Sequence, residues 1–113
     1  MSMIAAFFSA TAKAEASQTF LLDEYGTDIV LAYSLRKLSS TYSGNAIRVR
    51  ESSGNTETDI GFDANGDLDT SALTTFVGSN DGFVTKWYDQ SGNSNDAEQS
   101  TASGQPHIIF FFF

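Results

Sequence analysis

Residues 45–51 alternate between apolar and polar side chains, which is typical of a strand with one buried face. The pattern predicts that Ile47 and Val49 face a core and that Arg48 and Arg50 face solvent. Two interpretations of the arginines stay open. They could stack on a sugar or clamp a carboxylate, or they could form a solvated face that pairs with nearby acidic residues.

A second strand is predicted over 56–62, after a turn of Ser, Gly and Asn at 52–55. Because this turn is short, the two strands are expected to form a hairpin. A third strand is predicted over 83–88, where aromatic and β-branched residues alternate again. Trp87, the only tryptophan of the chain, ends this strand and is expected to anchor the core. Gly and Asn residues in the turn that follows are expected to supply positive φ values.

The stretch 29–38 has the spacing of an amphipathic helix. Its apolar residues recur at intervals of four, three and four from Leu31 to Tyr42, and Thr27 or Asp28 is placed to cap it. We therefore predict a short helix packed on the core.

A second short helix is predicted over 71–77, with Asp69 or Thr70 as its N-cap. Gly78 follows, and a glycine just beyond the last turn commonly ends a helix. The apolar residues of this segment are expected to face inward. Two short helices among several short strands indicate a mainly β fold.

Composition narrows the class of protein. The 113 residues suffice for one domain or part of one, and the 41% of hydrophobic residues can fill a core. A formal net charge of −8 disfavours binding to nucleic acid, and neutral sugars or cations are better candidate partners. No apolar run approaches the roughly 20 residues that span a bilayer, so no membrane partner is expected. The chain has no cysteine, which excludes disulfides and zinc–thiolate sites, and no cofactor is expected. The plentiful Ser, Thr, Asn and Gly fit an extracellular or virion-associated β-protein.

Four oxygen-bearing side chains alternate in a glycine-containing loop: Asp63, Asn65, Asp67 and Asp69. Such a loop could offer oxygen ligands to calcium. The EF-hand pattern requires glycine at its sixth position, whereas Gly66 is fourth when counting starts at Asp63. The mismatch favours the alternative, a turn followed by a helix cap.

Both ends of the chain leave alternatives open. Residues 1–17 have the outline of a secretory signal, but no Lys or Arg precedes their apolar part, so a simple N-terminal tail is the other interpretation. Near the other end, a further strand is expected to begin within 96–101 and a loop over 102–106. The apolar run 107–113 either pairs as a buried strand or shows that the chain is cut off within a larger fold, which is the interpretation we favour. His107, the only histidine, lacks partners for a metal site or a catalytic triad.

Residues from about 20 to 106 resemble the N-terminal part of the α-L-arabinofuranosidase B catalytic domain, glycoside hydrolase family 54. The resemblance rests on four segments, of which the last matches the signature loop of the family residue for residue: 32–40, 46–50, 66–72 and 88–93. Sequences of this shorter type also resemble modules of phage and marine-virus appendage proteins. We divide the chain into an N-terminal tail or signal-like segment, 1–19, and a partial arabinofuranosidase-B-like domain, 20–113.

The resemblance implies a concanavalin A-like jelly-roll β-sandwich, incomplete in this chain, and arabinose-bearing or other glycans as ligands. Fungal members carry a pair of cysteines where this chain has Val77 and Gly82. The catalytic carboxylates of the family lie beyond the signature loop, so no residue here inherits a catalytic role. Because a partial sandwich leaves open sheet edges, we expect low stability or self-association.

The signature loop is expected to be structural, with Asp89 and Ser91 tied to backbone amides. Its residues are Trp87, Tyr88, Asp89, Gln90, Ser91, Gly92 and Asn93. Candidate sugar contacts are Trp87, Tyr88, Arg48 and Arg50.

Three functions compete. The first, which we favour, is a carbohydrate-recognition or structural β-sandwich module that is inactive by itself. The second is a fragment of a retaining arabinofuranosidase, and the third is an interaction domain of a larger assembly. One sandwich can host all three functions, so the fold does not decide between them.

Overall fold

The computed structural model describes residues 19–26 and 28–109. The predictions for 1–17 and the cap at Thr27 therefore lie outside the described residues, as does the end of the apolar run, 110–113. The elements in chain order are α2 (Leu21–Tyr25), β1 (Ile47–Glu51), β2 (Glu57–Ile60), α3 (Thr70–Val77), β3 (Gly82–Trp87), β4 (Ala97–Glu98), the 3-10 helix η2 (Ala102–Gly104) and β5 (His107–Ile109). No helix among these residues is long and apolar enough to span a membrane.

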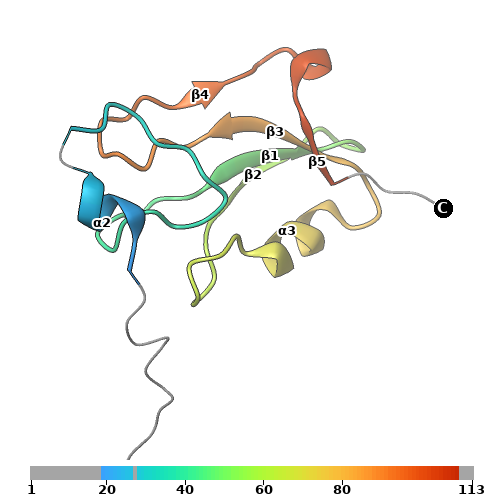
Figure 1. Ribbon diagram of the computed structural model, residues 1–113. Helices are drawn as coiled ribbons and strands as arrows, with labels where there is room; N and C mark the ends of the chain where they lie inside the picture. Colours follow the sequence, from blue (N-terminus) through green and yellow to red (C-terminus); the bar gives the residue numbers. More distant parts are fainter. Residues whose placement is uncertain (1–18, 27, 110–113) are drawn as a thin grey trace, which may run out of the picture.

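The strands form one five-stranded antiparallel sheet (Figure 1). Its order is β2-β1-β3-β4, and β5 also pairs with β3. β1 and β2 form the predicted hairpin, in which Ile47 pairs with Ile60 and Arg50 with Glu57. The three predicted strands are confirmed, with ends that differ by one or two residues. The fourth, expected within 96–101, is only two residues long, and the expected loop 102–106 contains η2.

The core lies between the sheet and α3, which covers one of its faces (Figure 1). Ile47 and Val49 are fully buried, as the alternation predicted, and Leu73 and Val77 of α3 pack against them. Within residues 19–26 and 28–109, the buried apolar residues are Ala46, Ile47, Val49, Ile60, Leu73, Val77 and Val84. This small set is consistent with a mainly β unit that buries apolar side chains on one face of its sheet.

The predicted helix α3 is confirmed, as are the residues predicted to begin and end it. The side chain of Asp69 accepts a hydrogen bond from the Ala72 amide at 2.9 Å, which satisfies one of the free donors in the first turn. Gly78 ends the helix with φ +59°, a conformation that favours glycine.

The helix predicted over 29–38 is wrong. No helix is present there, and the first helix described is α2, which begins eight residues earlier at Leu21. The backbone of this segment bonds to distant parts of the chain instead of to itself. The Lys37 amide donates to the Gly66 carbonyl at 2.7 Å, and the Leu38 carbonyl accepts from the Leu22 amide at 2.7 Å.

The apolar run near the C-terminus begins as a strand. β5 pairs with β3 through Gly82–Ile109 and Phe83–His107, and Ile108 and Ile109 pack against the core. The described part of this run therefore pairs as a strand, as one interpretation expected, but His107 is exposed and the two isoleucines are only partly buried.

The hairpin turn between β1 and β2 is built around Glu51, whose side chain is only 6% exposed. Its carboxylate accepts hydrogen bonds from the amides of Ser53 and Gly54 and from the hydroxyls of Ser53 and Thr56, at 2.6 to 3.0 Å. These bonds, first the one from the Ser53 side chain, lower the pKa of Glu51 from 4.5 to about 2.

We expect the ionised Glu51 to contribute to stability in a pH-dependent way. The contribution is complete above the ordinary pKa of 4.5 and is lost as the pH falls towards about 2, because only the unfolded chain then takes up a proton. Glu51→Gln should lower the urea midpoint at pH 7, and its difference from the unsubstituted chain should shrink at pH 3. Urea titrations followed by Trp87 fluorescence measure both values. Glu24→Gln, at an exposed site, is the control, and an equal Glu51→Gln effect at both pH values would contradict the prediction.

Candidate functional site

The signature loop continues directly from β3 and faces the segment 29–38, which lies more than fifty residues earlier in the sequence. The loop turns on two residues with positive φ, Gly92 at +94° and Ser94 at +59°. A glycine with positive φ was expected in this turn and is present. The second positive φ belongs to Ser94, whereas an asparagine was expected there. The loop contacts the segment through its polar side chains.

Asp89 is buried, with 4% of the residue exposed, and its carboxylate accepts four hydrogen bonds. One carboxylate oxygen accepts from the amides of Ala32 and Ser91 at 2.8 and 2.9 Å. The other accepts from the Asn95 amide at 2.9 Å and from the Ser91 hydroxyl at 2.8 Å. Burial by itself raises the pKa of Asp89, but the hydrogen bonds from Ser91, Asn95 and Ala32 outweigh it and hold this pKa below its usual range. The expected bonds of Asp89 and Ser91 to the loop backbone are thus present.

Gln90 is 2% exposed, and its side chain forms hydrogen bonds with the backbone of residues 34–38. Its side-chain oxygen accepts from the Leu38 amide at 2.8 Å, and its side-chain nitrogen donates to the carbonyls of Ser34 and Arg36 at 3.2 and 2.9 Å. Its own backbone amide donates to the Ala32 carbonyl at 2.8 Å. One glutamine therefore supplies the hydrogen bonds that a helix or a neighbouring strand would otherwise supply.

Two asparagines complete the contact. The side-chain nitrogen of Asn93 donates to the carbonyls of Ile29 and Val30 at 2.9 and 3.0 Å, and that of Asn95 donates to Val30 at 2.9 Å. In addition, the Tyr33 hydroxyl donates to the Asn95 carbonyl. The loop thus binds the segment 29–38 in a non-helical form. Sequence reasoning missed this role because it reads the spacing of apolar residues within a segment, and none of these partners lies within the segment.

The four candidate sugar contacts do not gather at one place. Trp87 pairs with Ile47 across the sheet and packs against the core, as expected of an anchor. Tyr88 lies on the opposite face, where its hydroxyl donates to Asp59 at 2.6 Å. Burial and then this hydrogen bond raise the pKa of Tyr88 to about 12. Trp87 is therefore separated by the sheet from the other three candidates.

The two arginines occupy the same polar face as Tyr88 and already have partners. Arg48 pairs with Glu57 and Asp59 at 2.9 and 3.0 Å, as in the interpretation of a solvated face paired with acids. Arg50 donates to the side-chain oxygens of Asn55 and Gln105, both at 2.8 Å, and its guanidinium lies 4.5 Å from the centre of the Phe83 ring. A hollow of about 250 Å³ lies on this face, lined by Arg48, Glu57, Thr85, Lys86, Glu98, Gln99, Ser100 and Gln105. Most of these residues were not singled out from the sequence, although the alternation of β1 places Arg48 on this face.

The acidic loop does not bring its side chains together. Asp63 accepts from the amides of Asn65 and Asp67 at 2.8 and 3.0 Å, Asp67 pairs with Arg36 at 3.4 Å, and Asp69 caps α3. Within residues 19–26 and 28–109 no group of three or more His, Cys, Asp or Glu side chains could hold a metal ion. The geometry thus matches the turn and helix cap that were the alternative to calcium.

Comparison with known families decides what the signature loop belongs to. The family described as "Alpha-L-arabinofuranosidase B, catalytic" matches residues 19–108. The chain belongs to this family. The resemblance based on the four segments is therefore confirmed.

Individual members of the arabinofuranosidase B family agree with this assignment. The alpha-L-arabinofuranosidase B of Emericella nidulans is 40% identical over 81 residues, which are 70% of this chain and 16% of that protein. Solved structures of a GH54 α-L-arabinofuranosidase are 36% identical with a TM-score of 0.62, and the match covers 70% of this chain and 17% of theirs. One was soaked with a cyclic sulfate inhibitor, and another is a complex with arabinofuranosyl-alpha-1,2-xylobiose. The jelly-roll β-sandwich expected from the resemblance is thus the fold class, and the chain spans about a sixth of the length of these relatives.

The resemblance places Val77 and Gly82 where fungal members carry a pair of cysteines. Val77 and Gly82 stand at these two positions and touch each other. A Cβ atom on Gly82 would lie 3.0 Å from the Cγ1 atom of Val77. Val77 therefore fills the space between the end of α3 and the start of β3, and an apolar contact joins the two elements.

Proposed function

We propose that this chain is a carbohydrate-recognition module of the arabinofuranosidase B family, which binds arabinofuranosyl-bearing glycans without hydrolysing them. The observation that carries the proposal is the family match over 19–108, which includes an intact signature loop. A related structure in complex with arabinofuranosyl-alpha-1,2-xylobiose supports the class of ligand. We further propose an extracellular location, where such glycans occur.

The structural use of three of the acidic side chains supports the absence of hydrolysis. A retaining glycosidase needs two carboxyl groups about 5–5.5 Å apart, one as nucleophile and one as general acid and base. Asp89 and Glu51 are buried and accept several hydrogen bonds each, and Asp59 is shared between Arg48 and Tyr88. These three carboxylates have structural partners and are not available to attack a sugar.

The charge of the chain favours a neutral glycan. With a net charge of −8, the surface repels polyanions such as pectic acids or sulfated polysaccharides. Arabinan and arabinoxylan carry no such charge.

The test is binding and hydrolysis measured on the same preparation. We expect retention of the chain on arabinan or arabinoxylan in affinity electrophoresis and no retention on polygalacturonic acid. No release of 4-nitrophenol from 4-nitrophenyl α-L-arabinofuranoside is expected. Xylan without arabinose is the matched control for the arabinosyl group. Hydrolysis would contradict the proposal and favour an enzyme, whereas absence of binding to every glycan would favour an interaction domain.

One observation favours the interaction domain as a second candidate function. Several large apolar side chains of α2 and the following segment are exposed, including Tyr25 at 67%, Val30 at 68% and Leu21 at 58%. Exposed apolar groups close together in sequence are typical of a surface that another protein surface covers. Size-exclusion chromatography would show this as self-association.

A further inference from the structure

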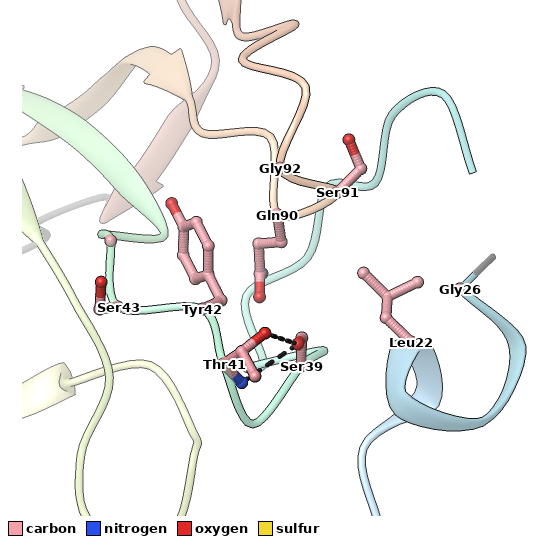
Figure 2. A pocket seen from close by; sticks show the side chains of 10 residues that line it. Leu22, Gly26, Ser39, Thr41, Tyr42, Ser43, Gln90, Ser91 and Gly92 are labelled. Atoms are coloured by element: carbon pink, nitrogen blue, oxygen red, sulfur yellow. Dashed lines mark hydrogen bonds between the residues drawn. The ribbon is translucent and has the colours of Figure 1, made fainter. Parts of the chain in front are cut away.

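We propose that a pocket beside the signature loop binds a single neutral sugar residue of pentose size. The pocket has a volume of about 380 Å³, which lies in the range of small-molecule sites. It is lined by Leu22, Gly26, Ser39, Thr41, Tyr42, Ser43, Gly44, Gln90, Ser91 and Gly92 (Figure 2). The inference rests on the proposed function and assigns a place to it that differs from the polar face of the sheet.

The walls of the pocket are held in place before any ligand arrives. Gln90 is fixed by its bonds to Leu38 and Arg36. The Tyr42 hydroxyl donates to the Asn45 carbonyl at 2.7 Å, and the Tyr42 ring meets Phe62 edge to face with 6.4 Å between ring centres. A site with fixed walls loses little conformational entropy on binding, which allows even a small ligand to bind.

The lining is polar but carries no charge. It has hydroxyl groups on Ser39, Thr41, Ser43 and Ser91, and none of its ten residues is ionised at neutral pH. By contrast, the hollow on the sheet face is lined by four charged side chains that pair within the protein, among them Lys86 and Glu98 at 3.0 Å. A neutral lining in an acidic protein selects an uncharged, hydroxyl-rich ligand.

Some of these hydroxyls can still form hydrogen bonds. Ser39 donates to Asp23 at 3.1 Å, so the Thr41 hydroxyl donates to Ser39 at 3.0 Å and retains a free lone pair as acceptor. The Ser43 hydroxyl makes no hydrogen bond within the described part of the chain, and it can both donate and accept. Figure 2 shows Thr41 on the Gln90 side of Tyr42 and Ser43 on its other side, so a sugar between Leu22 and Tyr42 would meet the Thr41 hydroxyl.

The pocket also has apolar surfaces. Figure 2 shows Leu22 on one side and Tyr42 on the other, with Gln90 between them and Ser39 and Thr41 at one end. The C–H groups of a sugar ring need such surfaces, while its hydroxyls need the polar end. At Gly92 a Cβ atom would meet nothing within 4 Å, so the protein leaves space beside the loop.

The test uses the full chain and methyl α-L-arabinofuranoside as the probe. We expect NMR titration to shift the amide signals of Thr41, Ser43 and Gly92 more than those of the sheet face. Thr41→Trp should fill the pocket and weaken binding about tenfold or more, a loss of about 1.4 kcal/mol. Thr75→Trp is the matched control, because Thr75 is also an exposed threonine but lies on α3, outside the pocket, and it should bind as the unsubstituted chain does. Galacturonic acid, a charged sugar, should not shift these signals.

The outcomes separate this inference from the proposed function. If arabinan binds, but the shifts map to Arg48 and Lys86 and Thr41→Trp binds normally, the pocket assignment is overturned and the function stands. If neither the probe nor any glycan binds, both are overturned. Circular dichroism of Thr41→Trp must match that of Thr75→Trp. If it does not, the smaller change Thr41→Val, which removes the hydroxyl and keeps the shape, takes its place and must weaken binding for the assignment to hold.

Discussion

Asp89→Asn is expected to destabilise the fold by about 3 kcal/mol or more, because at least two of the four hydrogen bonds to the carboxylate are lost and bonds to charged groups contribute about 1.5–3 kcal/mol each. An amide keeps one acceptor oxygen and turns an NH₂ group towards other donors. It therefore cannot accept hydrogen bonds from the Ala32 and Ser91 amides at one position and from the Asn95 amide at the other. Domains of this size have total stabilities of about 5–15 kcal/mol, so this loss removes a large part of the total.

Urea unfolding followed by the fluorescence of Trp87 measures this effect, since Trp87 is the only tryptophan. Asp63→Asn is the matched control. Asp63 also accepts from two backbone amides, but it is exposed, so water can replace the lost bonds and the change should cost about 1 kcal/mol or less. Equal urea midpoints for Asp89→Asn and the unsubstituted chain would show that the carboxylate is not what holds the loop.

Gln90→Ala is expected to release the segment 29–38 while the sheet persists. The substitution leaves the Leu38 amide and the carbonyls of Ser34 and Arg36 without these partners. The three bonds are only partly buried, so water can replace some of them and each lost bond should cost about 1 kcal/mol. The sheet keeps its own pairing of strands, including that of β1 with β2. The loss should therefore appear as local opening and not as global unfolding.

Hydrogen exchange detects such local opening directly. The Leu38 amide should exchange about tenfold to a hundredfold faster in Gln90→Ala, whereas the amides of β1 should change little. Gln99→Ala is the control. The Gln99 side chain also accepts from a backbone amide, that of Thr101, but at an exposed site outside the segment. Equal acceleration at Leu38 and in β1 would mean that the segment and the sheet unfold as one unit.

The parts of the fold that the sequence predicts correctly are those determined by near neighbours. The alternation of 45–51 places Ile47 and Val49 in the core, and the 52–55 turn closes the hairpin. Asp69 and Gly78 mark the two ends of α3, because helix caps act on backbone groups only a few residues away. In each case, the residues that specify the element lie within or directly beside it.

The segment 29–38 shows where this kind of inference fails. Its apolar residues follow a helical spacing, yet its backbone donors and acceptors are taken by Asp89 and Gln90. Tertiary hydrogen bonds here override a local preference that amounts to less than about 1 kcal/mol per residue. The family resemblance correctly named the loop, but a motif does not state which backbone groups its side chains bind.

The pocket also depends on residues that are distant in the sequence, so local patterns do not predict it. Its lining comes from three parts of the chain, around Leu22, Tyr42 and Ser91, and no spacing within the sequence connects them. The candidate sugar contacts have aromatic or charged side chains, and the structure packs Trp87 against the core and pairs Arg48 with acids. Serine and threonine hydroxyls carry no distinctive pattern, so they could not be singled out.

The bonds between the signature loop and the segment 29–38 also bear on the order of events during synthesis. They join residues 52 to 65 positions apart, so they have a high contact order and closing them costs loop entropy. A ribosome makes the segment long before the loop, and the segment must therefore wait, with its backbone groups bonded to water, until β3 and the loop have emerged. The N-terminal third of the domain is in this sense a late-folding region, and its exposed Leu21, Val30 and Leu31 are a place where chaperones could protect the nascent chain.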